Sequence, residues 1–195
     1  FALWDAPQPP KHGGSSRAIG VGCSHSDATG LISAIESTNL KVAGLFTPST
    51  ALAASLTPPQ QGSTLAAVDI GWTDSTFILI GHGAIVFERQ FGGCGVGAFV
   101  ARLAKLRGLD PIKLSAALRH VDRPEGNHPA VREVVERLTD AVAAEVRSSV
   151  EYLNGCDGVN VPMKIVLAGG GSALPGIADA ISAAAGVETR AHADD

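Results

Sequence analysis

Short apolar runs dominate the chain between residues 65 and 90 and predict three strands in quick succession. The runs cover residues 65–70, 76–80 and 84–90 and are bounded by glycine and polar residues. Runs of this length with turn residues on both sides are typical of buried strands. Gly81-His82-Gly83 separates the second and third runs, and a compact turn of this kind joins antiparallel strands. We therefore expect an antiparallel hairpin on one side of a sheet.

Apolar positions with helical spacing follow these strands. The first such stripe consists of Val96, Phe99, Val100, Leu103 and Leu106. Gly108 is expected to end this helix, and Asp110-Pro111 is expected to begin another that ends near residue 120. The longest pattern covers residues 130–153 and would span roughly 35 Å as a helix. The chain then continues with a strand, a helix and a strand, at residues 163–168, 174–185 and 187–191.

The part of the chain before residue 57 predicts a small α/β segment. Its expected elements are a strand, a helix, a strand and a helix, at residues 17–22, 26–38, 40–46 and 48–56. Ser26 and Asp27 are the expected cap of the first helix, which carries Leu31, Ile32 and Ile35 on one face.

A proline- and glutamine-rich stretch at residues 57–63 is the best candidate for a boundary. We therefore divide the chain into a small α/β segment at residues 1–56, a linker at residues 57–64 and a larger domain at residues 65–195. Three strands followed by alternating helices and strands predict a mixed sheet, antiparallel on one side and parallel on the other. The helix at residues 130–153 should pack on this five-stranded sheet and bury Val135, Leu138 and Val142.

The composition argues against several classes of function and site. The 195 residues are 45% hydrophobic and 17% charged, with a net charge of −4, so no broad basic surface points to nucleic acid. Three widely spaced cysteines indicate a reducing compartment and neither a disulfide framework nor a zinc site. No apolar run is long enough for a membrane span. Because Phe1 is not an initiator methionine, we expect an excerpt or a processed product.

Two glycine turns carry the candidate chemistry. Residues 68–76 read Val-Asp-Ile-Gly-Trp-Thr-Asp-Ser-Thr, and residues 166–172 read Val-Leu-Ala-Gly-Gly-Gly-Ser. A strand that ends in an acid and a tight glycine turn can present backbone N–H groups to a phosphate. A glycine turn between a strand and a helix lets the backbone approach a flat ligand closely. Two such turns that face each other would form a nucleotide cleft.

The residues of the first turn have both a ligand-binding and a structural interpretation. Asp69 would hold Mg²⁺ through water, because a hard cation prefers carboxylate oxygen, or it would accept N–H bonds within its own turn. Gly71, Thr73 and Ser75 would donate to phosphate or would only form a tight hairpin. Asp74 is better explained as a solvated turn acid than as a metal ligand.

The glycines of the second turn also allow two interpretations. Gly169, Gly170 and Gly171 would let adenine or ribose lie against the backbone, or they would permit a close crossing of strand and helix. Three glycines before Ser172 exceed what a simple turn needs, which favours the ligand.

Two other patterns are set aside. The stretch Gly93-Cys94-Gly95-Val96-Gly97 partly imitates a dinucleotide-binding fingerprint. That fingerprint needs a second parallel strand that ends in an acid about 20 residues later, and here the corresponding stretch is predicted to be helical. No two histidines have i, i+4 spacing on a predicted helix, so a histidine metal site is not expected.

These turns and three further stretches resemble actin-like ATPases, in particular the PilM family of type IV pilus assembly proteins, to which the cell-division protein FtsA is related. The further stretches are Phe91-Gly92-Gly93, residues 145–152, and residues 40–46 with 50–53. The resemblance runs from about residue 17 to the end of the chain. It implies a ribonuclease H-like mixed α/β sheet with helices on both faces, preceded by the end of the first half of such a fold.

The resemblance implies ATP and Mg²⁺ as ligands, with Asp69 as the catalytic residue that holds Mg²⁺ through water. The nucleotide-binding residues that it implies are Gly71, Trp72, Thr73, Ser75, Glu145, Ser148, Gly169, Gly170, Gly171 and Ser172, with Glu145 and Ser148 reaching the ribose hydroxyls. The chain lacks the family's first phosphate motif, an Asp-x-Gly-rich hairpin near the N-terminus. Trp72 and Asp74 occupy a turn that small or hydroxyl residues usually line. We therefore expect a fragment that is at most a weak ATPase.

The resemblance also implies a partner peptide from a membrane-anchored pilus or type II secretion component. It allows a homo-oligomer and indicates a cytoplasmic location, peripheral to the inner membrane through partners. Val42, Leu45 and Phe46 would supply apolar contacts to a peptide groove, or they would belong only to a core. Two other functions stay open: an interaction module that binds no nucleotide, and a kinase-like enzyme of the same superfamily. A kinase needs a substrate-positioning base in its first half, and none is identifiable.

Overall fold

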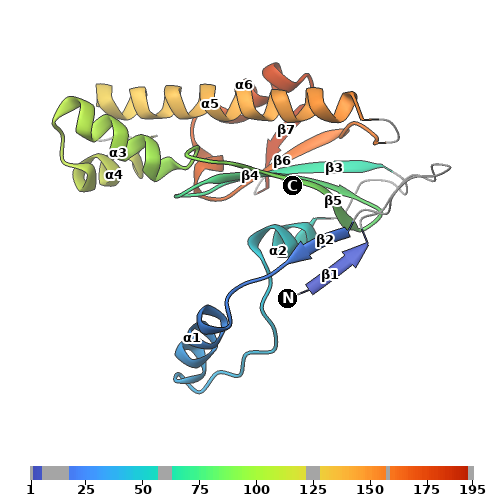
Figure 1. Cartoon of the computed structure of the whole chain (residues 1–195). Coiled ribbons are helices and arrows are strands. Elements are labelled where there is room, and N and C mark those ends of the chain that lie inside the picture. The colour runs from blue at the N-terminus through green and yellow to red at the C-terminus, as the bar shows by residue number, and fades with distance from the viewer. Residues whose placement is uncertain (1, 6–17, 57–62, 122–127, 157–158, 193–195) are drawn as a thin grey trace.

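A five-stranded mixed sheet forms the centre of the protein (Figure 1). The computed structural model describes residues 2–5, 18–56, 63–121, 128–156 and 159–192. The strands are β3 (Thr64–Ile70), β4 (Ser75–Gly81), β5 (Ala84–Phe91), β6 (Lys164–Ala168) and β7 (Glu188–Ala191), in the spatial order β5-β4-β3-β6-β7. The pairs β3–β4 and β4–β5 are antiparallel, whereas β3–β6 and β6–β7 are parallel. The predicted mixed sheet is confirmed.

Residues 65–68 of the central strand β3 form a continuous apolar run because both faces of the strand are covered. Ala66, Val68 and Ile70 belong to the main core, while Leu65 and Ala67 belong to a smaller cluster on the opposite face. Strands buried on both faces have continuous rather than alternating hydrophobic runs.

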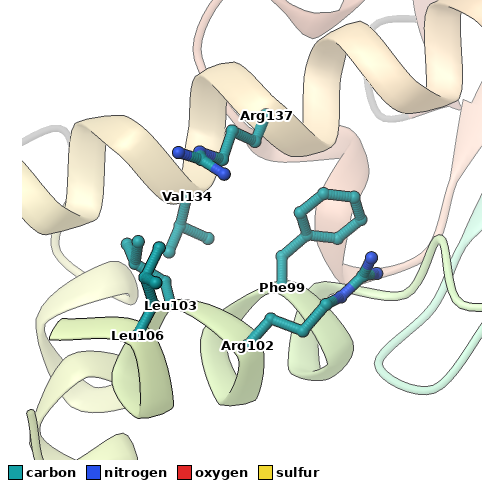
Figure 2. Close-up of a pocket in the computed structure, with 6 residues that line it drawn as sticks. All are labelled: Phe99, Arg102, Leu103, Leu106, Val134 and Arg137. Carbon is teal, nitrogen blue, oxygen red and sulfur yellow. The ribbon is translucent and has the colours of Figure 1, made fainter. Parts of the chain in front are cut away.

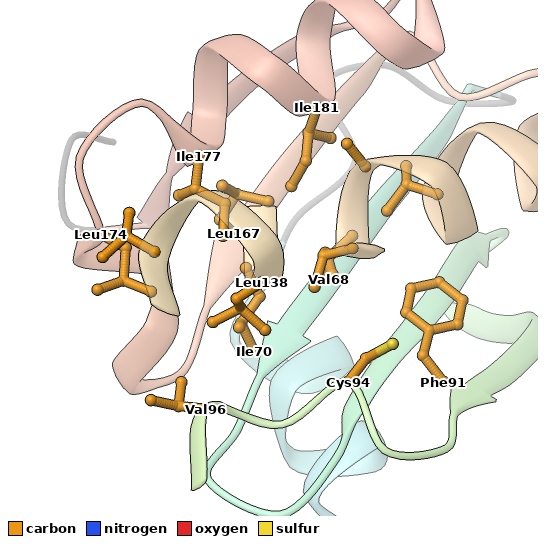
Figure 3. Close-up of a cluster of buried hydrophobic side chains, with 14 of the residues drawn as sticks. Val68, Ile70, Phe91, Cys94, Val96, Leu138, Leu167, Leu174, Ile177 and Ile181 are labelled. Atoms are coloured by element: carbon orange, nitrogen blue, oxygen red, sulfur yellow. The ribbon is translucent and has the colours of Figure 1, made fainter. Parts of the chain in front are cut away.

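Helix α5 (Pro129–Asn154) covers the main core face of the sheet. Val135, Leu138 and Val142 are buried, as predicted. Figure 3 shows Leu138 of α5 beside Ile70 of β3, within a cluster that also includes residues of β6 and of the helix that follows it. This packing fixes the ends of β3 and β6 relative to the long helix.

Helices α3 (Val96–Arg107) and α4 (Pro111–Leu118) extend the core beyond the edge of the sheet. The predicted end of α3 and the predicted start of α4 are confirmed. Gly108 caps the C-terminus of α3 with a φ of 64°, and the Asp110 side chain caps the N-terminus of α4. Leu106 was expected in the buried stripe, but 66% of its surface is exposed. The expectation was wrong because Leu106 lies at the margin of the face that packs on α5.

The glycine turn after β6 continues into the short 3₁₀ helix η2 (Gly170–Ala173), and α6 (Ile177–Ala185) follows. The sequence predicted one helix from residue 174. That start was too early, because Gly176 adopts a φ of 77° and Leu174 is extended, so Pro175-Gly176 interrupts the helix.

The segment before β3 contains β1 (Ala2–Asp5), β2 (Ala18–Val21), α1 (His25–Glu36) and α2 (Pro48–Ser55). β1 and β2 form a separate antiparallel pair. Helix α2 packs on the second face of the sheet through Leu52, Ala53 and the adjoining Leu56. Helix α1 projects away from the sheet (Figure 1) and has no buried residue.

Two local predictions in this segment are wrong. Residues 40–46 form no strand, because no neighbouring strand pairs with them among the described residues. The cap of α1 is Ser24, which accepts a bond from the Asp27 N–H, rather than Ser26. The predicted division of the chain stays a prediction: residues 57–62 of the expected linker lie outside the described residues, and β3 already begins at Thr64.

Candidate functional site

The two glycine turns lie side by side because β3 and β6 are parallel neighbours. Asp69 is paired with Ala168 in the sheet register, so Gly169 follows β6 next to the end of β3. A Cβ atom on Gly169 would overlap the Asp69 carboxylate and lie 2.6 Å from the Ile70 carbonyl oxygen. A Cβ atom on Gly171 would lie 2.9 Å from the Cβ of Ile70. Close approach between the turns therefore requires glycine at both positions.

The first turn is closed by its own backbone. The Gly71 N–H donates to the Asp74 carbonyl at 3.1 Å. Trp72 and Thr73 form the exposed tip, and within the described ranges no hydrogen bond uses either N–H as donor. The Ser75 hydroxyl is fully buried and donates to the Cys94 carbonyl at 2.6 Å. The tip thus offers backbone N–H groups, while the Ser75 hydroxyl is already bonded inside the protein.

The start of α3 supports this turn from the side. The Val96 N–H donates to the Gly71 carbonyl at 3.0 Å, and the Gly97 N–H donates to the Trp72 carbonyl at 2.8 Å. Amides at a helix N-terminus are otherwise open to an anion. Here two of them bind the turn, so they hold its shape.

The glycines of the rejected dinucleotide pattern have a structural role. A Cβ atom on Gly95 would lie 2.5 Å from the Asp74 nitrogen, and one on Gly97 would lie 2.5 Å from Nε1 of the Trp72 indole. These glycines let the start of α3 pack directly on the turn between β3 and β4.

Asp74 ties the same turn to β5. Its Oδ1 accepts a bond from the Gly93 N–H at 3.1 Å, and its Oδ2 accepts one from Nε2 of Gln90 at 3.3 Å. The Gly93 carbonyl accepts from the Arg102 guanidinium. Sequence reasoning missed Arg102, because nothing in its spacing indicates that it reaches back across the start of α3.

Asp69 has a different environment from Asp74. It is half-buried, and its carboxylate has no hydrogen-bond or ion-pair partner among the residues that the structure describes. The described part of the chain contains no group of three acidic, histidine or cysteine side chains that would hold a metal ion. A cation at Asp69 would therefore take water or ligand oxygens as its other ligands, which suits Mg²⁺.

Glu145 and Ser148 lie elsewhere. Both are on α5 and face Arg89 of the edge strand β5: Nη2 of Arg89 donates to Glu145 Oε2 at 2.6 Å, and Nη1 donates to the Ser148 hydroxyl at 3.3 Å. Strands β4 and β3 separate β5 from β6. The structure does not bring these two residues together with the Gly169–Ser172 turn, and their contact with ribose stays a prediction.

Cys94, whose carbonyl accepts the bond from the Ser75 hydroxyl, has a buried thiol. Burial raises the pKa of Cys94 above its ordinary value of 9.0, and the nearby Glu145 carboxylate raises it further. The neutral thiol therefore packs as part of the core, beside Phe91 in Figure 3.

The predicted partner residues are on the surface. Val42 is half-buried, whereas Leu45 and Phe46 are 43% and 76% exposed. The alternative that Leu45 and Phe46 belong only to the core is therefore wrong. Their contact with a peptide stays a prediction.

Comparisons with known proteins place this fold. Residues 32–192 match the family described as type IV pilus assembly protein PilM. The chain belongs to this family. The predicted resemblance to PilM within the actin-like ATPases is thereby confirmed. A search of curated proteins finds no match.

Two solved structures show the same fold at low sequence identity. The PilM-PilN type IV pilus biogenesis complex contains a chain with a TM-score of 0.69 and 18% identity, over 97% of this chain and 55% of that one. MreB 5 of Spiroplasma citri bound to AMPPNP has a TM-score of 0.58 and 13% identity, over 89% of this chain and 61% of that one. The fold is the actin-like, ribonuclease H-like one. The chain spans 55% and 61% of the length of these two relatives.

No helix in the described ranges has both the length and the hydrophobicity that a membrane crossing requires.

Proposed function

We propose that the chain is a nucleotide-binding scaffold of type IV pilus or type II secretion assembly. In this proposal the edge at the ends of β3 and β6 takes ATP with Mg²⁺. The observation that carries the proposal is the position of Asp69, a carboxylate with no partner among the described residues, directly against the Gly169 backbone. Mg²⁺ is usually held by one or two carboxylates together with water and phosphate oxygens.

Three groups of the chain fit such a ligand. Asp69 would hold the cation through water, the N–H groups of Trp72 and Thr73 would bind phosphate oxygens, and the Gly169 to Gly171 backbone would support the nucleoside. Mg²⁺, when bound, would neutralise phosphate charge next to Asp69 and Asp74. Asp74 would not be a metal ligand in this proposal, because both of its oxygens already accept hydrogen bonds. The AMPPNP-bound MreB relative supports a nucleotide at this fold.

The partner would be a peptide from a membrane-anchored pilus component on the cytoplasmic side. Exposed apolar side chains before β3 support this part, namely Leu31, Leu40, Leu45 and Phe46. The likeness to a chain of the PilM-PilN type IV pilus biogenesis complex supports the class of partner. In this arrangement the chain would lie beside the inner membrane through its partner.

A second candidate function is an interaction module that binds no nucleotide. The observation in its favour is that the Gly71 N–H, the Ser75 hydroxyl and the first amides of α3 are all bonded within the protein. In the first turn, this leaves the N–H groups of its exposed tip, Trp72 and Thr73, for a phosphate.

Thermal unfolding with and without Mg-ATP tests the nucleotide proposal. The chain should gain stability with Mg-ATP, and Asp69→Asn should remove this gain while its own unfolding temperature stays close to that of the wild type. Asp74→Asn is the matched control: it should lower stability by about 1–2 kcal/mol through weakened bonds to Gly93 and Gln90 and keep a Mg-ATP gain. No gain in the wild type would support the interaction module. An unchanged gain in Asp69→Asn would remove Asp69 from the site.

A further inference from the structure

A pocket between α3 and α5 lies outside the candidate nucleotide site. Its lining consists of Phe99, Arg102, Leu103 and Leu106 of α3 and Val134 and Arg137 of α5. Figure 2 shows apolar side chains between the two helices, with Arg137 above them and Arg102 beside Phe99. The pocket has a volume of about 90 Å³. Sites for small molecules usually measure about 300–1,000 Å³, so this pocket suits one side chain of a partner protein.

The rim of the pocket combines an exposed leucine with guanidinium groups. Leu106 is 66% exposed, although it continues the apolar stripe of α3. The Arg102 guanidinium lies 4.3 Å from the centre of the Phe99 ring, which holds it at the edge of the pocket. Arg102 donates to the Ala98 and Gly93 carbonyls. Since a guanidinium has five N–H donors, some of these donors stay open to a ligand.

Charge around the pocket differs from that of the chain as a whole. The two charged residues that line the pocket, Arg102 and Arg137, are both basic, whereas the whole chain contains 15 Lys and Arg and 19 Asp and Glu. Arg107 and Arg137 share one carboxylate, Glu133, at 3.0 Å and 2.6 Å. Lys105 is exposed and has no ion-pair partner among the described residues. The surface near the pocket therefore carries surplus positive charge.

We propose that this pocket docks an acidic amphipathic helix of a partner protein. One apolar side chain of that helix would enter between Phe99 and Leu106, and carboxylates on its flanks would pair with Arg102 and Arg137. A helix can place one apolar side chain in the pocket while carboxylates three or four residues away on the same face reach the guanidinium groups at the rim, and arginine pairs with carboxylates through two parallel hydrogen bonds. The lining of this pocket includes none of the residues proposed to bind the nucleotide or the pilus peptide, although Arg102 also bonds the Gly93 carbonyl beside the first glycine turn.

The pocket favours a peptide over a membrane surface. A helix that lies on a bilayer presents a continuous apolar face to the lipid. Leu106 is strongly exposed on the outward side of α3, and no other large apolar residue of this helix is strongly exposed among the described residues. A single apolar site with a concave floor and charged rims matches one anchoring side chain.

Fluorescence polarisation with a labelled amphipathic helical peptide, which has Leu on one face and Glu on the other, tests this inference. The chain should bind this peptide, and binding should weaken with salt. Leu106→Ser and Arg137→Gln should each weaken it roughly tenfold. The matched controls are Ile112→Ser, another exposed apolar residue, and Arg147→Gln, another exposed arginine of α5. Neither control should change the affinity.

Four outcomes would overturn the proposal. One is no binding of the Glu-Leu peptide by the wild type. The second is equal binding of a peptide in which Lys replaces Glu. The third is equal weakening by the control variants. The fourth is binding to vesicles of phosphatidylglycerol, but not to the peptide, that Leu106→Ser abolishes, since this would make the surface a membrane site. Circular dichroism of each variant separates loss of binding from loss of fold.

Discussion

The carboxylate of Asp69 and the backbone of Gly169 are so close that no side chain fits at residue 169. Gly169 also has a φ of 79°, a backbone conformation that residues with a Cβ atom rarely adopt. Conformation and space therefore both demand glycine at the junction of the two turns. The contact couples the end of β3 to the end of β6, and it determines how the Asp69 carboxylate is presented.

Gly169→Ala should destabilise the protein by about 2 kcal/mol or more, because it combines an unfavourable φ with a steric overlap. Gly170→Ala is the matched control, since a Cβ atom there would meet nothing within 4 Å. Urea unfolding measures both variants. Equal stability of the two would show that the turns separate readily, and that the close contact does not constrain Asp69.

The sheet could be predicted because each of its strands carries a local signal. Glycine turns mark the boundaries of strands β3 to β5. The long periodic stripe of apolar residues on α5 defines the one face of that helix that can be buried. The strand predicted at residues 40–46 failed because an apolar run becomes a strand only when another strand pairs with it. No local pattern contains that information.

The site was only partly predictable for a similar reason. The sequence identified both glycine turns and the cleft that they would form if they faced each other, but the pairing of β3 with β6 that brings them together is seen in the structure. The neighbours of Glu145 could not be predicted from the sequence. Helical spacing shows that Glu145 flanks the buried stripe of α5, but not that it faces Arg89 of β5. Likewise, the buried bond of Ser75 to Cys94 depends on how a distant turn packs.

Glu145→Gln should lower the free energy of unfolding by only about 0.5 kcal/mol, because a partly exposed ion pair contributes little. The side chains of Glu145 and Arg89 are each 38% exposed. Glu151→Gln, whose partner Arg147 is 3.9 Å away, is the control and should cost less. The predicted contact of Glu145 with ribose is tested in the same variants: it requires that Mg-ATP stabilisation falls in Glu145→Gln and stays unchanged in Glu151→Gln. Unchanged stabilisation in both variants would remove Glu145 from the nucleotide site.

Cys94 should make stability decrease at alkaline pH. Burial raises the pKa of its thiol in the folded state above 9.0. In the unfolded chain the thiol ionises at its ordinary pKa, so the unfolded state gains stability as pH rises from that value toward the folded pKa. Below the ordinary pKa both states hold the proton, and the contribution of the thiol stays constant.

Urea unfolding of the wild type and of Cys94→Ala, at neutral pH and at about pH 10, measures this effect. The wild type should lose more free energy of unfolding than the variant between the two conditions. The cavity left by the missing sulfur lowers stability at both pH values and cancels in the comparison. Equal losses would mean that the Cys94 thiol ionises as readily in the folded protein as in the unfolded one.

Phe46→Ser should separate partner binding from folding. With 76% of its surface exposed, Phe46 contributes little to the core, so the variant should unfold within about 0.5 kcal/mol of the wild type. A peptide from the membrane-anchored partner should nevertheless bind less tightly, since an exposed aromatic side chain is a typical anchor at an interface. Ile112→Ser is the control, because Ile112 is 78% exposed on α4. Isothermal calorimetry with that peptide measures both variants. Equal affinities would place the peptide elsewhere, and a marked loss of stability in Phe46→Ser would return Phe46 to a structural role.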